Sequence, residues 1–156
     1  MATGLIQSSC FRPVLFGISR NMAELFVAIY QPRNQTLGTY HWALYLRVSP
    51  TEHYVFQVVG EACSFKYDEC STAPENSVHH IEDIRVAEID DVDHFRQVVK
   101  EQKVENEIYH WGCQQWTFDV LESLVDDGLL TDYDKDEVKL KLDPLFGARV
   151  EDKYEV

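Results

Sequence analysis

Cys113 stands between a glycine and two glutamines in the stretch YHWGCQQWTFDVLESLVDDGLL, where an amphipathic helix is predicted to begin. A helix N-terminus supplies partial positive charge and unpaired backbone N–H groups, which stabilise a thiolate. The same N–H groups would hold the oxyanion of a tetrahedral intermediate. The position of Cys113 therefore indicates a nucleophile for acyl chemistry. The alternative is a buried thiol that only fills space on an apolar helix face.

A cysteine nucleophile needs a base, and the chain offers six histidines. His41 opens the run HWALYLRV, where strand alternation puts His41, Ala43 and Tyr45 on one face. The others lie in a turn, a polar loop, an exposed helix side or the approach to the Cys113 helix: His53, His79, His80, His94 and His110. His41 is thus the predicted base, and its alternative role is that of a half-buried structural histidine.

The stretches YHWALYL, YVFQVVG and GCQQW resemble the lecithin:retinol acyltransferase-like branch of the circularly permuted papain-like superfamily, over roughly residues 24 to 125. That family places a His-Trp-Ala-Leu-Tyr strand before a helix that opens with cysteine, and this chain has the same order. The resemblance implies a permuted papain-like fold. It also implies a covalent acyl-enzyme mechanism with Cys113 as nucleophile and His41 as general base, later general acid.

The third member of the site has two candidates. Aligned with the family's second strand, Gln57 takes the place of the residue that orients the base, and its amide oxygen can accept an imidazole N–H. A tight turn around Pro50 would instead put Glu61 nearly opposite His41. Both would share the face of His41 if the strand runs past Gly60. The candidates for the substrate pocket are Trp42, Tyr45, Trp111, Gln114 and Trp116.

The chain also departs from the family pattern. Gly112 stands where asparagine is common, Trp116 replaces phenylalanine, and the second-strand histidine is absent. The C-terminal ARVEDKYEV lacks the hydrophobic anchor of the membrane-acting relatives. These departures favour a soluble acyl, amide or thioester substrate over phospholipid or retinyl ester.

The elements that must position these residues follow from periodicity. Runs rich in β-formers predict strands at 24–31, 41–48, 53–60, 63–70 and 84–89. Helical spacing predicts helices after Asp91, from Cys113 to Gly128 and over 132–146. The sequence therefore predicts one α+β domain, an antiparallel sheet of about four to six strands packed with about three helices. Its parts are an irregular segment 1–23, a sheet half 24–90, a helical half 91–146 and an acidic tail 147–156.

The Cys113 helix has two predicted faces. Cys113, Trp116, Thr117, Val120, Leu121 and Leu124 share the buried face. The exposed face holds Gln114, Gln115, Asp119, Glu122 and Ser123.

Composition narrows the partners and the location. The chain of 156 residues has 27 acidic against 14 basic residues, a formal charge of −13, which disfavours nucleic acid and anionic lipid surfaces. We expect no membrane span, no secretory signal and reduced cysteines, hence a cytoplasmic protein. The spacing of Cys63, Cys70, His79 and His80 fits no compact zinc site, so we expect neither metal nor cofactor.

Two other functions stay open at this point. The domain would be a catalytically inactive scaffold that binds a protein partner, or a biosynthetic cyclase or condensing enzyme that uses the same Cys–His pair. The reactivity of the Cys113 thiol distinguishes a scaffold from an enzyme, because only in an active Cys–His pair does this reactivity depend on His41.

Overall fold

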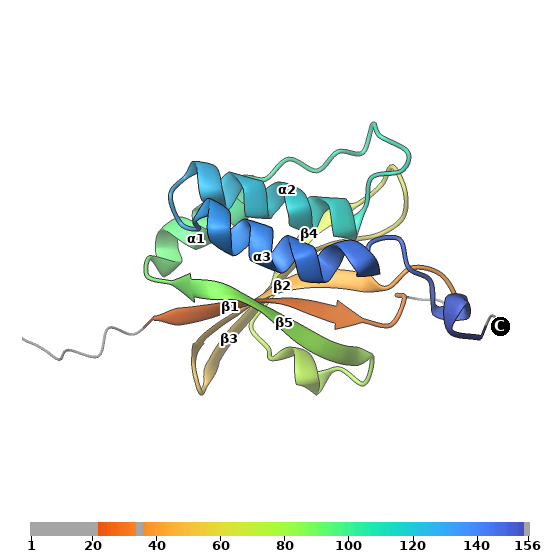
Figure 1. Ribbon diagram of the computed structural model, residues 1–156, viewed down its shortest axis with the longest axis horizontal. Coiled ribbons are helices and arrows are strands. Elements are labelled where there is room, and N and C mark those ends of the chain that lie inside the picture. The colour runs from red at the N-terminus through yellow and green to blue at the C-terminus, as the bar shows by residue number, and fades with distance from the viewer. Residues whose placement is uncertain (1–21, 34–35, 155–156) are drawn as a thin grey trace, which may run out of the picture.

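The computed structural model describes residues 22–33 and 36–154. Five strands form one antiparallel sheet in the order β4-β3-β2-β1-β5, and three helices lie together on one of its faces (Figure 1). The predicted α+β class is confirmed. The strands are β1 Ala23–Tyr30, β2 His41–Ser49, β3 Glu52–Val59, β4 Lys66–Cys70 and β5 His80–Ile89.

The helices are α1 Val92–Glu101, α2 Cys113–Asp126 and α3 Asp132–Leu142. Asp91 caps α1 by accepting a hydrogen bond from the backbone N–H of His94. Thr131 and Asp134 form a reciprocal capping box at α3. Gly128, at φ +78°, follows the end of α2, as the sequence predicts. The helix predicted over 132–146 ends at Leu142 and continues as a 3-10 turn through Pro144.

Strand β2 is buried on both faces, which explains its nearly continuous apolar sequence. Trp42, Leu44 and Leu46 join the main core beneath the helices. Ala43 and Tyr45 belong to a smaller cluster on the opposite, helix-free face, together with Ala28, Tyr30 and Val55. The predicted alternation along this strand is therefore correct, and it puts the side chain of His41 on the helix-free side of the strand.

Strand register brings the polar residues of three strands together. Leu44 pairs with Phe56, so Gln57 follows opposite Ala43, one diagonal step from His41. Gln57 in turn pairs directly with Asp68 on β4. Strand β3 stops at Val59 because Gly60 has φ +124°, where a Cβ atom would lie 2.7 Å from the carbonyl oxygen of Ser64. The strand therefore does not continue to Glu61.

The C-terminal segment is ordered against the approach to β2. The 3-10 helix Val150–Tyr154 follows a bridge between Thr39 and Arg149. The N–H of Val150 donates to Gly38 at 2.9 Å, and the N–H of Gly38 donates to Glu151 at 2.9 Å. Much of the predicted acidic tail thus helps to fix the loop before His41. The irregular segment predicted for 1–23, with Cys10, lies outside the described residues except for its last two positions.

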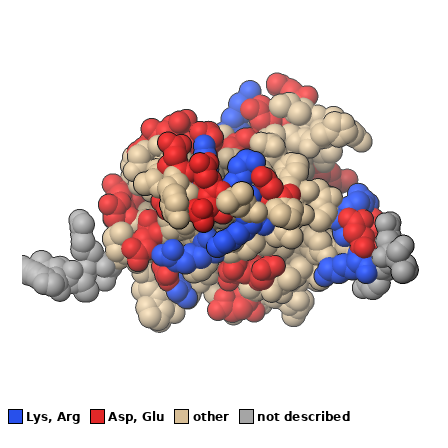
Figure 2. Space-filling view, viewed as in Figure 1, with Lys and Arg blue, Asp and Glu red and all other residues tan. Residues whose placement is uncertain are grey.

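Charge is spread widely over the surface. Figure 2 shows acidic side chains over much of one face, with basic side chains gathered across its middle. Among the described residues, no helix is long and apolar enough to cross a membrane.

Candidate functional site

Cys113 and His41 line one cavity of about 750 Å³. The cavity lies where the start of α2 meets the start of β2 and the end of β3. Its other walls include Tyr40, Gly60, His110, Gln115 and Phe146. Helix and strand thus deliver the predicted nucleophile and the predicted base to the same opening, although they are 72 residues apart in the chain (113 − 41).

The Cys113 sulfur lies among backbone N–H groups. Cys113 is the first residue of α2, and the backbone N–H groups of Trp42, Gln114 and Cys113 itself favour the thiolate and lower its pKa. Burial raises the pKa of the Cys113 thiol, and these N–H groups act against that rise. Because Trp42 directly follows His41, the thiol is held against the strand that carries the base.

Gln114 fastens the start of α2 to its surroundings. Its Nε2 donates to the backbone oxygen of Tyr40 at 3.0 Å, and its Oε1 accepts from the N–H of Gly147 at 2.9 Å. Gln114 is therefore buried, and its predicted place on the exposed helix face is wrong. The helical periodicity of the sequence cannot predict the burial of Gln114, because both ends of its amide hydrogen-bond to backbone groups that are distant in sequence.

His41 is held by a buried amide. Its Nε2 lies 2.7 Å from Oε1 of Gln57, and Nε2 of Gln57 donates to Asp68 at 2.9 Å. An ionised carboxylate only accepts, so the nitrogen end of Gln57 must face Asp68 and the oxygen end must face His41. Nε2 of His41 therefore carries the proton. Nδ1 keeps its lone pair and is the atom left to act as a base.

Burial keeps His41 neutral. Burial, with a smaller contribution from the guanidinium of Arg33, lowers the pKa of His41 to about 4. The bond to Gln57 acts in the opposite direction, because its amide oxygen stabilises the imidazolium. With the pKa of the Cys113 thiol raised, the cavity near neutral pH is lined by a protonated thiol and a neutral imidazole.

Of the two predicted third members, Gln57 occupies the position beside His41. Glu61 is exposed, lies beyond the end of β3 and lines the outer part of the same cavity. The sequence alone does not single out Asp68, which is one of several acidic residues near the stretch CSFKYDEC. Asp68 contacts Gln57 only because β4 pairs with β3.

Four of the five predicted pocket residues do not line this cavity; Gln114 does. Trp42 and Trp116 are fully buried in the core, because each projects between the sheet and α2. Tyr45 lies on the helix-free face and bonds His53, with 2.7 Å between its hydroxyl and Nδ1. The indole of Trp111 is buried and donates to Asp119 at 2.9 Å.

The remaining histidines are separate from the pair, apart from His110 on the cavity wall. His80 contacts Asp83 and His94 contacts Asp127. Within the part of the chain that the structure describes, no group of three or more His, Cys, Asp or Glu side chains is placed to hold a metal ion.

One protein-family profile matches residues 27–131, and its description is "Family of unknown function (DUF6540)". The match covers most of the chain, so the chain belongs to this family. It includes His41, Gln57, Asp68 and Cys113. No curated protein and no solved structure matches the chain.

The depressed pKa of His41 predicts a pH-dependent stability. The unfolded chain has the ordinary histidine pKa of 6.5 and binds more protons than the folded chain as pH falls toward about 4. The free energy of unfolding should therefore fall over this window, by about 3 kcal/mol from this residue. Chemical denaturation of wild type and His41→Gln at pH 7 and at about pH 4 checks it. Equal losses in both proteins would contradict the assignment.

The Gln57–Asp68 pair predicts the tautomer of His41. Long-range ¹H–¹⁵N NMR at neutral pH should show Nε2 protonated and Nδ1 unprotonated in wild type. In Asp68→Asn the partner can donate as well as accept, so Gln57 can turn over and the Nδ1–H form should gain population. Glu69→Gln on the same strand is the matched control, because Glu69 contacts Arg96 instead. An Asp68→Asn spectrum identical to wild type would refute this dependence.

Proposed function

We propose that this protein carries out cysteine-dependent acyl chemistry on an ester, amide or thioester, with Cys113 as nucleophile and His41 as base. The observation that carries the proposal is the cavity lined by both Cys113 and His41, together with the hydrogen bond by which Gln57 holds Nε2 of His41 and leaves Nδ1 unprotonated. Nucleophile, base and orienting group have the roles of a catalytic triad, and the orienting group is a neutral amide.

The first step forms a covalent acyl-enzyme. The Cys113 sulfur bonds to the substrate carbonyl carbon while Nδ1 of His41 takes the thiol proton. The resulting oxyanion would be stabilised by the N–H groups of Cys113 and Gln114, which have no intrahelical partner in the first turn of α2. When the tetrahedral intermediate collapses, its bond to the leaving group breaks and His41 returns the proton to that group.

The second step decides whether the reaction is hydrolysis or transfer. His41 removes a proton from the acceptor, which attacks the carbonyl carbon of the Cys113 thioester. The carbon–sulfur bond then breaks, and the sulfur takes the proton back from His41. Water as acceptor gives a hydrolase, an amine or alcohol gives an acyltransferase, and a nucleophile within the acyl chain gives a cyclase. All use the same pair, so the acceptor is set by the cavity and not by the catalytic groups.

A neutral resting pair fits this mechanism. The thiol gives up its proton as it attacks, so the buried site need not hold a separated thiolate and imidazolium between turnovers. The N–H groups around the sulfur offset part of the cost when the ion pair forms.

The substrate we propose is a small acyl compound in the cytoplasm. The charge of −13 disfavours nucleic acid, and the cavity opens at the surface between polar and aromatic side chains. The order of His41 before Cys113, each on the expected kind of element, supports a relation to the permuted papain-like enzymes.

Acyl transfer to Cys113 is the direct test. Incubation with an activated ester such as p-nitrophenyl acetate, followed by peptide mass spectrometry, should show one acetyl group on Cys113. The rate should fall by about 100-fold or more in His41→Ala, and less in Gln57→Leu, because a positioned base contributes at least that much. Cys113→Ala should give no acylation at this site, while Cys63→Ala, which removes an exposed thiol, should react like wild type.

The scaffold alternative gives a different result. If the exposed Cys63 acylates faster than Cys113, and Cys113 acylates equally in wild type and His41→Ala, the pair is not catalytic. The domain would then be a binding module. Circular dichroism of each variant separates loss of chemistry from loss of fold.

A further inference from the structure

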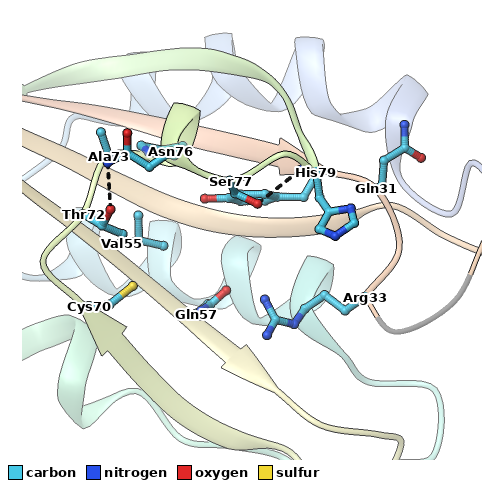
Figure 3. A pocket seen from close by; sticks show the side chains of 12 residues that line it. Gln31, Arg33, Val55, Gln57, Cys70, Thr72, Ala73, Asn76, Ser77 and His79 are labelled. Atoms are coloured by element: carbon cyan, nitrogen blue, oxygen red, sulfur yellow. Dashed lines mark hydrogen bonds between the residues drawn. The ribbon is translucent and has the colours of Figure 1, made fainter.

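A second cavity, of about 320 Å³, lies on the helix-free face of the sheet. Strand residues Tyr30, Val55, Gln57 and Cys70 form its floor. Its other wall comes from the 3-10 turn and the loop after it, through Pro74, Asn76, Ser77 and His79. Figure 3 shows this arrangement, with the Arg33 guanidinium directed toward Gln57. The helices that cover the other face take no part in it.

The lining of this cavity combines one cation with neutral polar groups. Arg33 is its only lysine or arginine among the described lining residues, and none of these is an aspartate or glutamate. The neutral polar side chains are Gln31, Gln57, Thr72, Asn76 and Ser77. Val55, Ala73 and Pro74 provide an apolar wall.

We propose that this cavity binds a small carboxylate ligand through Arg33, and that its occupancy acts on His41 across Gln57. A guanidinium matches a carboxylate by two parallel N–H bonds. The hydroxyl and amide groups can donate further hydrogen bonds, and the apolar wall suits a short aliphatic body. A single arginine among neutral groups fits a carboxylate of one charge better than a phosphate, which takes clustered cations.

Two residues connect this cavity with the catalytic one. Arg33 lines both cavities, and Gln57 lines the second cavity while it holds His41. The groups that face His41 are Gln57, the Tyr30 ring at 5.6 Å between centroids, Arg33 and the cavity wall with Cys113. Because the guanidinium lowers the pKa of His41, a bound carboxylate should neutralise it and shift this pKa upward.

NMR titration with butyrate tests the proposal on the full chain at fixed ionic strength. Butanamide is the control ligand, because it has nearly the same shape without the charge. Butyrate should give saturable shifts at Ser77, Asn76 and the Gln57 side-chain amide, and should raise the pKa of His41. Arg33→Met should weaken binding by about tenfold or more and abolish the pKa response. Arg85→Met, which removes an arginine that pairs with Glu24, should behave like wild type.

Four results would overturn the proposal. One is equal binding of butyrate to wild type and Arg33→Met while both remain folded, and another is equal binding of butanamide. The third is a response confined to His110 and Gln115, which would place the anion in the Cys113 cavity instead. The fourth comes from a titration with inorganic phosphate: tighter binding of phosphate than of butyrate would reject the carboxylate assignment. None of these readouts uses turnover, so failure here leaves the acyl proposal standing.

Discussion

The candidate site depends on one buried amide. Gln57 lies between His41, which can present either a donor or an acceptor, and Asp68, which when ionised only accepts. Only one orientation of the amide satisfies both contacts, and leaving a buried polar group unpaired costs roughly 1–3 kcal/mol. A carboxylate on β4 thereby determines which nitrogen of a histidine on β2 carries the proton. The strand register that aligns these residues is itself fixed by the apolar side chains on the other face of the sheet.

The protonation state of Cys113 depends on a balance between burial and backbone polarity. Burial alone would make Cys113 an inert thiol, because it disfavours the thiolate. The N–H groups at the start of α2 and on β2 reduce that penalty, and Gln114 holds the two elements together at this point. The same burial removes the charge from His41. In the proposed mechanism the proton therefore moves from Cys113 to His41 during attack.

Much of this arrangement could be predicted from local sequence. Alternating and helical patterns locate the strands and helices, and a histidine on a core strand and a cysteine at a helix start can be singled out by position. What could not be predicted depends on pairing between distant segments. The choice between Glu61 and Gln57 as the residue beside His41 requires the observed strand register and the backbone conformation of Gly60. Asp68 could be recognised only after β4 was placed beside β3. The aromatic residues Trp42 and Trp116 were predicted to line the substrate pocket, but they are core residues. Large side chains are needed there to fill the space between the sheet and α2.

The most direct test of the central claim is the pH dependence of Cys113 alkylation, read by peptide mass spectrometry in wild type and His41→Ala. If His41 accepts the thiol proton and the thiolate and imidazolium stabilise each other, Cys113 reacts as this ion pair, whose fraction is constant between the two titrations. The rate should then be nearly level around neutral pH and rise only in alkaline solution. His41→Ala should lose the level region and follow hydroxide concentration throughout. A wild-type rate that climbs about tenfold per pH unit, the same in both proteins, would mean that His41 does not act on Cys113 and that the site is not a catalytic pair.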